Sequence, residues 1–123
     1  MPAGSSGRRD DAVVVGGAVL EVRTFADDGP VVVEVAGEVD LLTAGRLRAA
    51  LDEAVRVAGG GRVIVDLGRV DFLDSTGVQA LIDGYHTAMV AGGTLTVRGA
   101  HGPPARVLTV TGLARLLGVE PRR

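Results

Sequence analysis

The sequence predicts an α/β domain with one mixed, mostly parallel sheet of four to five strands, an N-terminal hairpin and three to four helices. Two observations carry this prediction. Short runs rich in Val, Ile and Leu alternate with longer runs whose apolar residues recur at steps of three and four. Glycine-rich segments separate these runs, as is typical of the ends of helices and strands. Alternating strands and helices imply parallel strands joined by right-handed crossovers.

The first two expected strands form an antiparallel hairpin. Apolar and polar residues roughly alternate over 18–25, and a run rich in β-branched residues covers 31–36. Asp27-Asp28-Gly29-Pro30 lies between them and is typical of a turn, so the two strands are expected to pair. Ahead of the hairpin, residues 13–15 form either a short extra strand or a lead-in.

The first helix is expected to begin after Thr43 and to end at the glycines 59–61. Thr43 is the expected N-cap, its hydroxyl accepting a hydrogen bond from a free N–H of the first turn. One apolar stripe runs along the helix, formed by Leu47, Ala50, Leu51, Ala54 and Val57 or Ala58. The run 62–67 that follows is apolar enough to predict a strand buried on both faces, as central parallel strands are.

The second long helix is expected from Ser75 to about residue 91, where Gly92-Gly93 closes it. A strand follows over 94–98, since threonine and apolar residues alternate there. Pro103-Pro104 then begins a helix that reaches residue 110, because a proline in the first turn loses no backbone hydrogen bond. A last helical turn is expected over 112–117.

One domain over residues 12–118 is expected, because a chain of 123 residues that is 46% hydrophobic suits a single core. A disordered tail is expected over 1–11, which are rich in Gly, Ser, Arg and Asp, and a second tail over 119–123. The net charge of -2 offers no basic field, so no nucleic-acid partner is expected. Without an apolar run of roughly 20 residues or an apolar signal-peptide region, a cytoplasmic protein with no membrane partner is expected.

The segment Asp74-Ser75-Thr76-Gly77 lies between an apolar strand run and the second helix. A serine there lies where a helix offers unpaired N–H groups and a partial positive charge, which suit a phosphate. No base is near it in the sequence, so the hydroxyl is expected to be modified by another enzyme rather than to act itself. Simple helix capping is the alternative, since Asp, Ser and Thr all cap helices well.

An enzyme of its own ranks last among the hypotheses. Residues 73–77 nearly match the G-x-S-x-G nucleophile elbow, but Leu73 stands where the first glycine is required. The chain has two histidines, His86 and His101. His86 lies along the same predicted helix, roughly 16 Å from the serine at about 1.5 Å per residue. We therefore expect no catalytic residue.

No metal or cofactor is expected to bind either. Asp66, Asp71 and Asp74 are spread over a loop without paired histidines, and the chain has no cysteine. An Mg²⁺ site built from oxygens alone is the weaker alternative to turn and cap residues. The glycines 59–61 follow a helix and precede a strand, the reverse of a phosphate-binding loop, and the chain has no lysine.

Three blocks of the chain resemble the STAS domain family, named for sulfate transporters and anti-sigma factor antagonists. The likeness is greatest to the stand-alone bacterial antagonists. The blocks are 33–40 (VEVAGEVD) with Thr43-Ala44, 65–67 (VDL) with 70–78 (VDFLDSTGV), and 92–97 (GGTLTV) with Val107-Leu108 and Thr111-Gly112-Leu113. Together they cover about residues 18–118 in the order and spacing of the family, which implies a STAS-like fold.

The resemblance also implies a function. In the antagonists that this chain resembles, a partner anti-sigma factor, a kinase of the GHKL type, phosphorylates the serine after the aspartate. That serine is Ser75 here, with Thr76 as a rival acceptor. The unphosphorylated chain is expected to bind the kinase and release the sigma factor; phosphorylation breaks the complex and a PP2C-type phosphatase restores it. The implied partner-binding residues are Asp40, Asp74, Ser75, Thr76 and Gly77.

A second hypothesis stays open beside this one. Many STAS domains keep the fold without the switch. The chain could therefore be a STAS scaffold, or a small-ligand-binding module, within a larger sensory assembly.

Overall fold

The structure is a computed structural model that describes residues 9–15, 18–26 and 29–118. Within these residues, five strands form one sheet in the order of the chain. They are β1 (Arg9–Val15), β2 (Ala18–Ala26), β3 (Val31–Val39), β4 (Arg62–Leu73) and β5 (Thr94–Arg98). The pairs β1–β2 and β2–β3 are antiparallel, whereas β3–β4 and β4–β5 are parallel. The predicted α/β fold with a mixed sheet and an N-terminal hairpin is confirmed.

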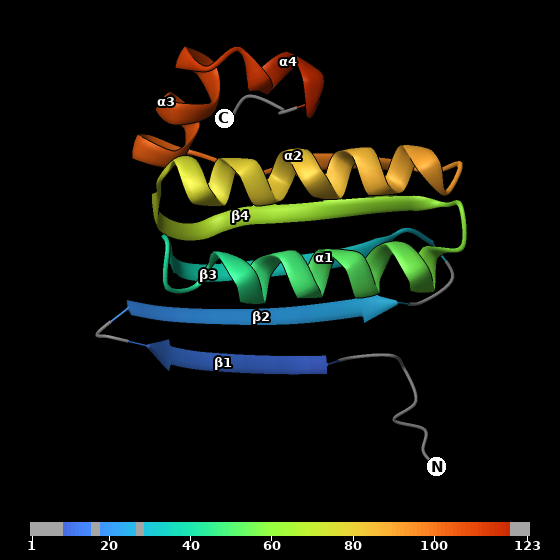
Figure 1. Ribbon diagram of the computed structural model, residues 1–123, viewed down its shortest axis with the longest axis horizontal. Helices are drawn as coiled ribbons and strands as arrows, with labels where there is room; N and C mark the ends of the chain where they lie inside the picture. The colour runs from blue at the N-terminus through green and yellow to red at the C-terminus, as the bar shows by residue number, and fades with distance from the viewer. Residues whose placement is uncertain (1–8, 16–17, 27–28, 119–123) are drawn as a thin grey trace.

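Two long helices, α1 (Ala44–Ala58) and α2 (Ser75–Val90), lie on the same face of the sheet (Figure 1). They connect β3 to β4 and β4 to β5, so both crossovers step in the same direction across the sheet. Two right-handed crossovers in one direction put their helices on one side. The shorter helices α3 (Gly102–Val110) and α4 (Leu113–Leu116) follow β5. α3 packs against β4 and α4, and the chain after α4 reaches β5, where the Val97 N–H donates to the Leu117 carbonyl at 2.9 Å.

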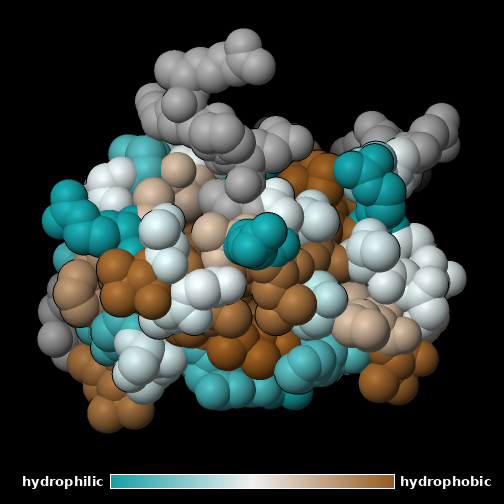
Figure 2. All heavy atoms as spheres, turned by 90° about the horizontal axis from the view of Figure 1, so that it is seen from above, coloured by the Kyte–Doolittle hydropathy of each residue, from teal (hydrophilic) through white to brown (hydrophobic). Residues whose placement is uncertain are grey.

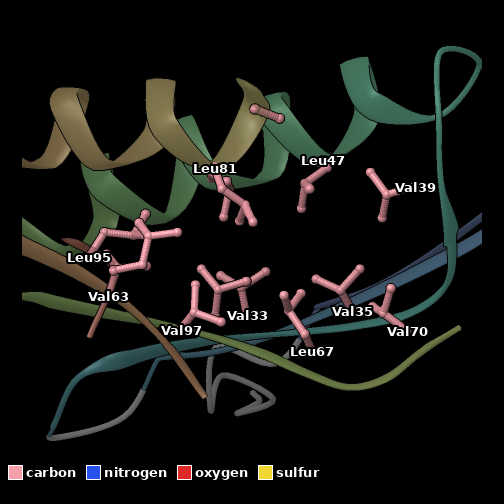
Figure 3. Packing of buried hydrophobic residues seen from close by; sticks show 14 of the residues in the cluster. Val33, Val35, Val39, Leu47, Val63, Leu67, Val70, Leu81, Leu95 and Val97 are labelled. Atoms are coloured by element: carbon pink, nitrogen blue, oxygen red, sulfur yellow. The ribbon is translucent and has the colours of Figure 1, made fainter. Parts of the chain in front are cut away.

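The hydrophobic core fills the space between the sheet and the two long helices (Figure 3). Leu47 from α1 and Leu81 from α2 point down onto valines and leucines of the strands. The fully buried aliphatic side chains include Val33, Val35, Leu47, Leu51, Val65, Leu67, Leu81 and Leu95. Because aromatics make up only 2% of the chain, the two layers are held by many small aliphatic contacts rather than by a few large rings.

The prediction that the strand after the first helix is buried on both faces is wrong. In β4, Val63, Val65 and Leu67 are buried, whereas the alternate residues Ile64 and Asp66 remain partly exposed. The cause is the shared face of α1 and α2, which leaves the opposite side of the sheet without a covering long helix. Parallel strands are buried on both faces only where crossovers put helices on both sides.

Among the strands that extend beyond their predicted bounds, β1 and β4 extend furthest. β1 begins at Arg9, inside the predicted tail, because its backbone pairs with β2 from Arg9↔Thr24 to Val15↔Ala18. β4 continues past the predicted end at residue 67 to Leu73, because β3 accompanies it as far as the pair Val39↔Leu73. Backbone pairing stabilises both extensions, and composition does not reveal it. The remaining predicted tail residues, 1–8 and 119–123, and the turn residues 27 and 28 lie outside the described residues.

Candidate functional site

The candidate site lies where the parallel strands β3 and β4 end together. Val39 and Leu73 are paired, and each is followed by an aspartate, Asp40 and Asp74. The two turns are also joined directly, because the Asp74 N–H donates to the Val39 carbonyl at 3.2 Å. In α/β sheets, binding sites form outside the carboxyl ends of parallel strands. The predicted residues Asp40 and Asp74 are therefore brought to one edge of the sheet.

Asp74 caps α2. Its Oδ1 atom accepts hydrogen bonds from the N–H groups of Thr76 at 2.9 Å and Gly77 at 3.3 Å. The Thr76 hydroxyl donates to the same oxygen at 2.5 Å. Capping, the alternative considered for this segment, is thus real, but the aspartate performs it and the serine does not.

Ser75 is the first residue of α2 and is exposed. Among the residues that the structure describes, none forms a hydrogen bond with its hydroxyl. The neighbouring Thr76 is partly buried, and its hydroxyl already donates to Asp74. The two adjacent hydroxyls therefore differ: one is open to a second protein, and the other is part of the cap.

The expectation that the helix start offers free donors to a phosphate needs correction. The N–H groups of Thr76 and Gly77 are already hydrogen-bonded to the Asp74 carboxylate. That carboxylate also places a negative charge at the positive end of the helix. A phosphate on Ser75 would therefore meet a helix start at which two of the N–H groups already have the Asp74 carboxylate as their acceptor.

Gly77 has a packing role at this site. It is buried, and a Cβ atom built on it would lie 2.5 Å from Leu73 Cδ1 and 2.7 Å from Val39 Cγ1. Carbon atoms do not approach so closely without displacement of one of them. The absent side chain lets the first turn of α2 pack against the ends of β3 and β4. Gly77 thereby sets the height of Ser75 above the sheet.

The turn after β3 repeats the hydrogen-bond pattern of the turn after β4. Asp40 Oδ1 accepts from the N–H groups of Leu42 at 2.9 Å and Thr43 at 3.3 Å, as Asp74 does two and three residues ahead. Leu41 thus holds the position in the first turn that Ser75 holds in the second. Like Ser75, Leu41 is exposed, with 77% of its surface accessible.

Thr43 precedes α1 as predicted, but its hydroxyl does not cap the helix. The side chain is fully buried; its hydroxyl donates to the Glu38 carbonyl at 2.8 Å and accepts from the Asp40 N–H at 3.1 Å. It thereby joins the end of β3 to the turn. The expected bond to the first turn of α1 is absent because the hydroxyl faces backward, toward the strand.

The other candidate residues lie apart from this arrangement. His86 is exposed on α2 and contacts the Tyr85 ring edge-on at 5.6 Å. His101 precedes α3, and its Nε2 lies 2.9 Å from the Gly68 carbonyl. Asp66 accepts from the Gly68 N–H at 2.8 Å and pairs with Arg98 at 3.0 Å. Over the described ranges, no three His, Cys, Asp or Glu side chains are grouped as a metal would require.

Sequence reasoning missed the exposed apolar residues at this edge. Leu41, Leu42 and Phe72 are 77%, 49% and 47% exposed, and they flank the two aspartates along the chain. A signal was available in part, because Leu41 and Leu42 precede the first helix and lie outside its apolar stripe. Whether they are covered depends on the tertiary structure, since neighbouring loops could have folded over them.

Comparison with known proteins agrees with this architecture. The sequence model of the family described as "Mlab, STAS domain" matches residues 22–118. An anti-sigma F factor antagonist of Paenibacillus polymyxa is 26% identical over 100 residues, covering 81% of this chain and 86% of the relative.

No helix in the described part of the chain has the length and apolar character needed to cross a bilayer.

Solved structures share the fold. The crystal structure of an anti-sigma factor antagonist from Mycobacterium paratuberculosis superposes with a TM-score of 0.75 at 29% identity, covering 89% of this chain and 92% of that one. The phosphorylated form of the Bacillus cell fate determinant SpoIIAA superposes with a TM-score of 0.59 at 18% identity, with 93% of each chain covered. Since the family model spans most of the sequence and the sheet and helices follow the same plan, this chain belongs to the STAS domain family.

Proposed function

We propose that this chain is an anti-sigma factor antagonist whose binding to an anti-sigma factor kinase of the GHKL type is switched off by phosphorylation of Ser75. The observation that supports the proposal most is the contrast between the two hydroxyls at the start of α2. Ser75 is exposed and without a hydrogen-bond partner among the described residues, whereas Thr76 is bound to Asp74. The likeness to proteins named as anti-sigma factor antagonists supplies the partner class.

The switch follows from charge at this edge of the sheet. A phosphate adds a charge of about −1.5 to −2. On Ser75 it stands next to Asp74, whose carboxylate already occupies the N-terminal N–H groups of α2. In the free chain, water solvates both charges. In a complex they are forced together and lose water, and a loss of about 3 kcal/mol weakens binding roughly a hundredfold. A PP2C-type phosphatase would reset the switch by removing the phosphate.

Phosphorylation in vitro tests this proposal. The chain is incubated with ATP and each GHKL-type anti-sigma factor encoded in the same genome, and the product is examined by intact mass and peptide mapping. We expect one phosphate, on Ser75, in the wild-type chain and in Thr76→Val, and none in Ser75→Ala. Phosphate on Thr76, or no phosphate with any of the kinases, would contradict the assignment.

Binding measurements separate the switch from a scaffold role. Ser75→Ala should bind the kinase as tightly as the unmodified chain, and Ser75→Asp should bind it at least about tenfold more weakly. A STAS scaffold in a sensory assembly would bind its neighbours with equal affinity in both variants. Equal affinities for the kinase would therefore favour the scaffold and overturn the switch.

A further inference from the structure

We infer that Leu41 and Leu42 form an apolar anchor by which this chain docks on its anti-sigma factor, in an apolar pocket of the partner that is rimmed by arginine or lysine. This inference rests on the proposed function and names the chemistry of the partner surface. It concerns two residues other than the proposed phosphorylation site, Ser75. Three properties of the described residues support it: exposure, rigidity and charge.

Leu41 and Leu42 are exposed in a turn that is held firmly. Leu41 is 77% exposed and Leu42 is 49% exposed. Their backbone is fixed by the Asp40 carboxylate, which accepts from the Leu42 N–H, and by the Asp40 carbonyl, which accepts from Thr43 and Ala44 at 3.1 and 2.8 Å. A side chain whose backbone is already ordered loses less entropy on binding than one in a loose loop.

The position of Leu41 places it beside the phosphorylation site. The strands β3 and β4 end at the pair Val39↔Leu73, and the turns that follow share one hydrogen-bond pattern. Leu41 and Ser75 are the equivalent residues of these two turns, and paired strands lie about 4.8 Å apart. A partner that covers the hydroxyl of Ser75 therefore also covers Leu41.

The charges around the anchor indicate what the partner must carry. Glu38, Asp40, Asp71 and Asp74 lie at this edge, and none of them forms an ion pair with a described residue. Elsewhere on the described surface, several carboxylates have arginine partners: Asp52 and Asp83 pair with Arg48, and Asp66 pairs with Arg98.

Arg46 and Arg69 are the arginines nearest to these four residues in sequence. Even when both are counted, negative charges at the edge outnumber positive charges by four to two, so the edge is acidic. An acidic rim around an apolar pair fits a protein surface with basic residues around an apolar pocket. It disfavours a second copy of this chain, which would present the same acidic edge, and it disfavours an anionic membrane.

A second exposed apolar area, on α3 and α4, lacks the acidic neighbours of Leu41 and Leu42. Figure 2 looks onto the side where Figure 1 places α3 and α4, and brown spheres gather in the middle of that face. Val110 on α3 is 79% exposed and Leu116 on α4 is 43% exposed. Those helices carry Arg106 and Arg115 and no acidic residue, so they would suit a partner of the opposite charge.

Titration calorimetry against one defined protein tests the anchor. The GHKL-type anti-sigma factors of the genome that encodes this chain are first immobilised one by one on affinity columns. The one that retains the unmodified chain is then the probe for calorimetry. Leu41→Ser and Leu42→Ser should each lower the affinity about tenfold or more, as expected of buried anchors in an interface. The matched controls are Val110→Ser, as exposed as Leu41, and Val90→Ser, 91% exposed at the far end of α2. Both controls should leave the affinity unchanged.

Charge is tested on the two carboxylates that make no hydrogen bond with a described residue. Glu38→Gln and Asp71→Asn should slow association and flatten its dependence on salt concentration, because long-range attraction governs the rate of encounter. Unchanged association kinetics and salt dependence in both variants would overturn the basic rim. Circular dichroism and thermal melting of every variant establish that a loss of affinity comes from the surface.

The outcomes distinguish this inference from the proposed function. If Ser75→Asp loses affinity while Leu41→Ser and Leu42→Ser bind like wild type, the anchor is overturned and the switch stands. If the leucine variants lose affinity while Ser75→Asp does not, the docking surface stands and the switch is overturned. If no anti-sigma factor of that genome binds the unmodified chain, both are overturned.

Discussion

Four adjacent residues at the start of α2 have different tasks. Asp74 supplies the cap, Thr76 donates its hydroxyl to that cap, and Gly77 lets the turn pack on the strands. Of the three polar side chains among these residues, only that of Ser75 makes no hydrogen bond with a described residue. A phosphate on the Ser75 hydroxyl would therefore leave the cap intact, whereas a phosphate on the Thr76 hydroxyl would break one of the hydrogen bonds of the cap.

The tight packing of Gly77 leads to a prediction about stability. Gly77→Ala should lower the free energy of unfolding by about 1–3 kcal/mol, because the new methyl group displaces Leu73 and Val39. This cost exceeds the helix-propensity gain of up to about 1 kcal/mol. Gly45→Ala is the matched control, since a Cβ atom there meets nothing within 4 Å. It should be neutral or stabilising, and urea denaturation midpoints measure both.

The same sign for the two alanine variants would contradict this account of Gly77. If Gly77→Ala proved as stable as wild type, the first turn of α2 would not be packed against the strand ends as the structure shows. The height of Ser75 above the sheet would then need another cause.

At the scale of elements, each helix of the site is preceded by an aspartate that closes the turn after a strand. Asp40 and Asp74 follow paired residues of two parallel strands, and each uses Oδ1 for two backbone N–H groups. Part of the acidic character of the edge thus comes from the aspartates that close the turns after β3 and β4. In each aspartate, Oδ1 stabilises the turn, and Oδ2 is available to a partner.

We expect Asp74→Ala to lower the free energy of unfolding by about 0.5–2 kcal/mol, the usual cost of a lost N-cap. Asp74→Asn keeps an acceptor oxygen and should recover most of that loss. Asp71→Ala removes an exposed carboxylate without a hydrogen bond to a described residue and serves as the control. Chemical denaturation measures all three, and a loss in Asp71→Ala as large as that in Asp74→Ala would argue against a specific cap.

At the scale of the whole molecule, the site is placed on a rigid support. The first turns of α1 and α2 rest on strand ends, and both helices are fixed from below by the aliphatic core. Arg48 adds a bridge between them, since it bonds to Asp83 of α2 at 2.8 Å as well as to Asp52 of α1. A charge added at the exposed Ser75 side chain breaks no hydrogen bond with a described residue.

Ser75→Asp should therefore leave the fold unchanged. Its melting temperature should stay within a few degrees of wild type, since exposed substitutions usually change stability by less than about 0.5 kcal/mol. Amide chemical shifts should change around the start of α2 and in the turn after β3, and not in β1, β2 or α3. Shift changes throughout the sheet would mean that the switch works by a conformational transition rather than by local charge.

Local features of the sequence predicted most of the elements. Periodicity and glycines gave the order of strands and helices, and the segment after β4 was identified as the start of a helix with an exposed serine. The helix cap at Asp74 was also open to prediction, because it depends on neighbours two and three residues ahead. Gly59, in a left-handed conformation at φ 55°, ends α1 where the glycines predicted it.

The sequence by itself thus determined most of the segments that become strands and helices, and which serine begins α2. Only the tertiary structure decided that α1 and α2 share one face, that the Thr43 hydroxyl faces the strand, and that Leu41 and Leu42 stay uncovered beside the acidic turns. The physical reason is the sequence separation over which each interaction acts. Capping and periodicity act between residues a few positions apart, whereas burial depends on which distant segment packs against a side chain.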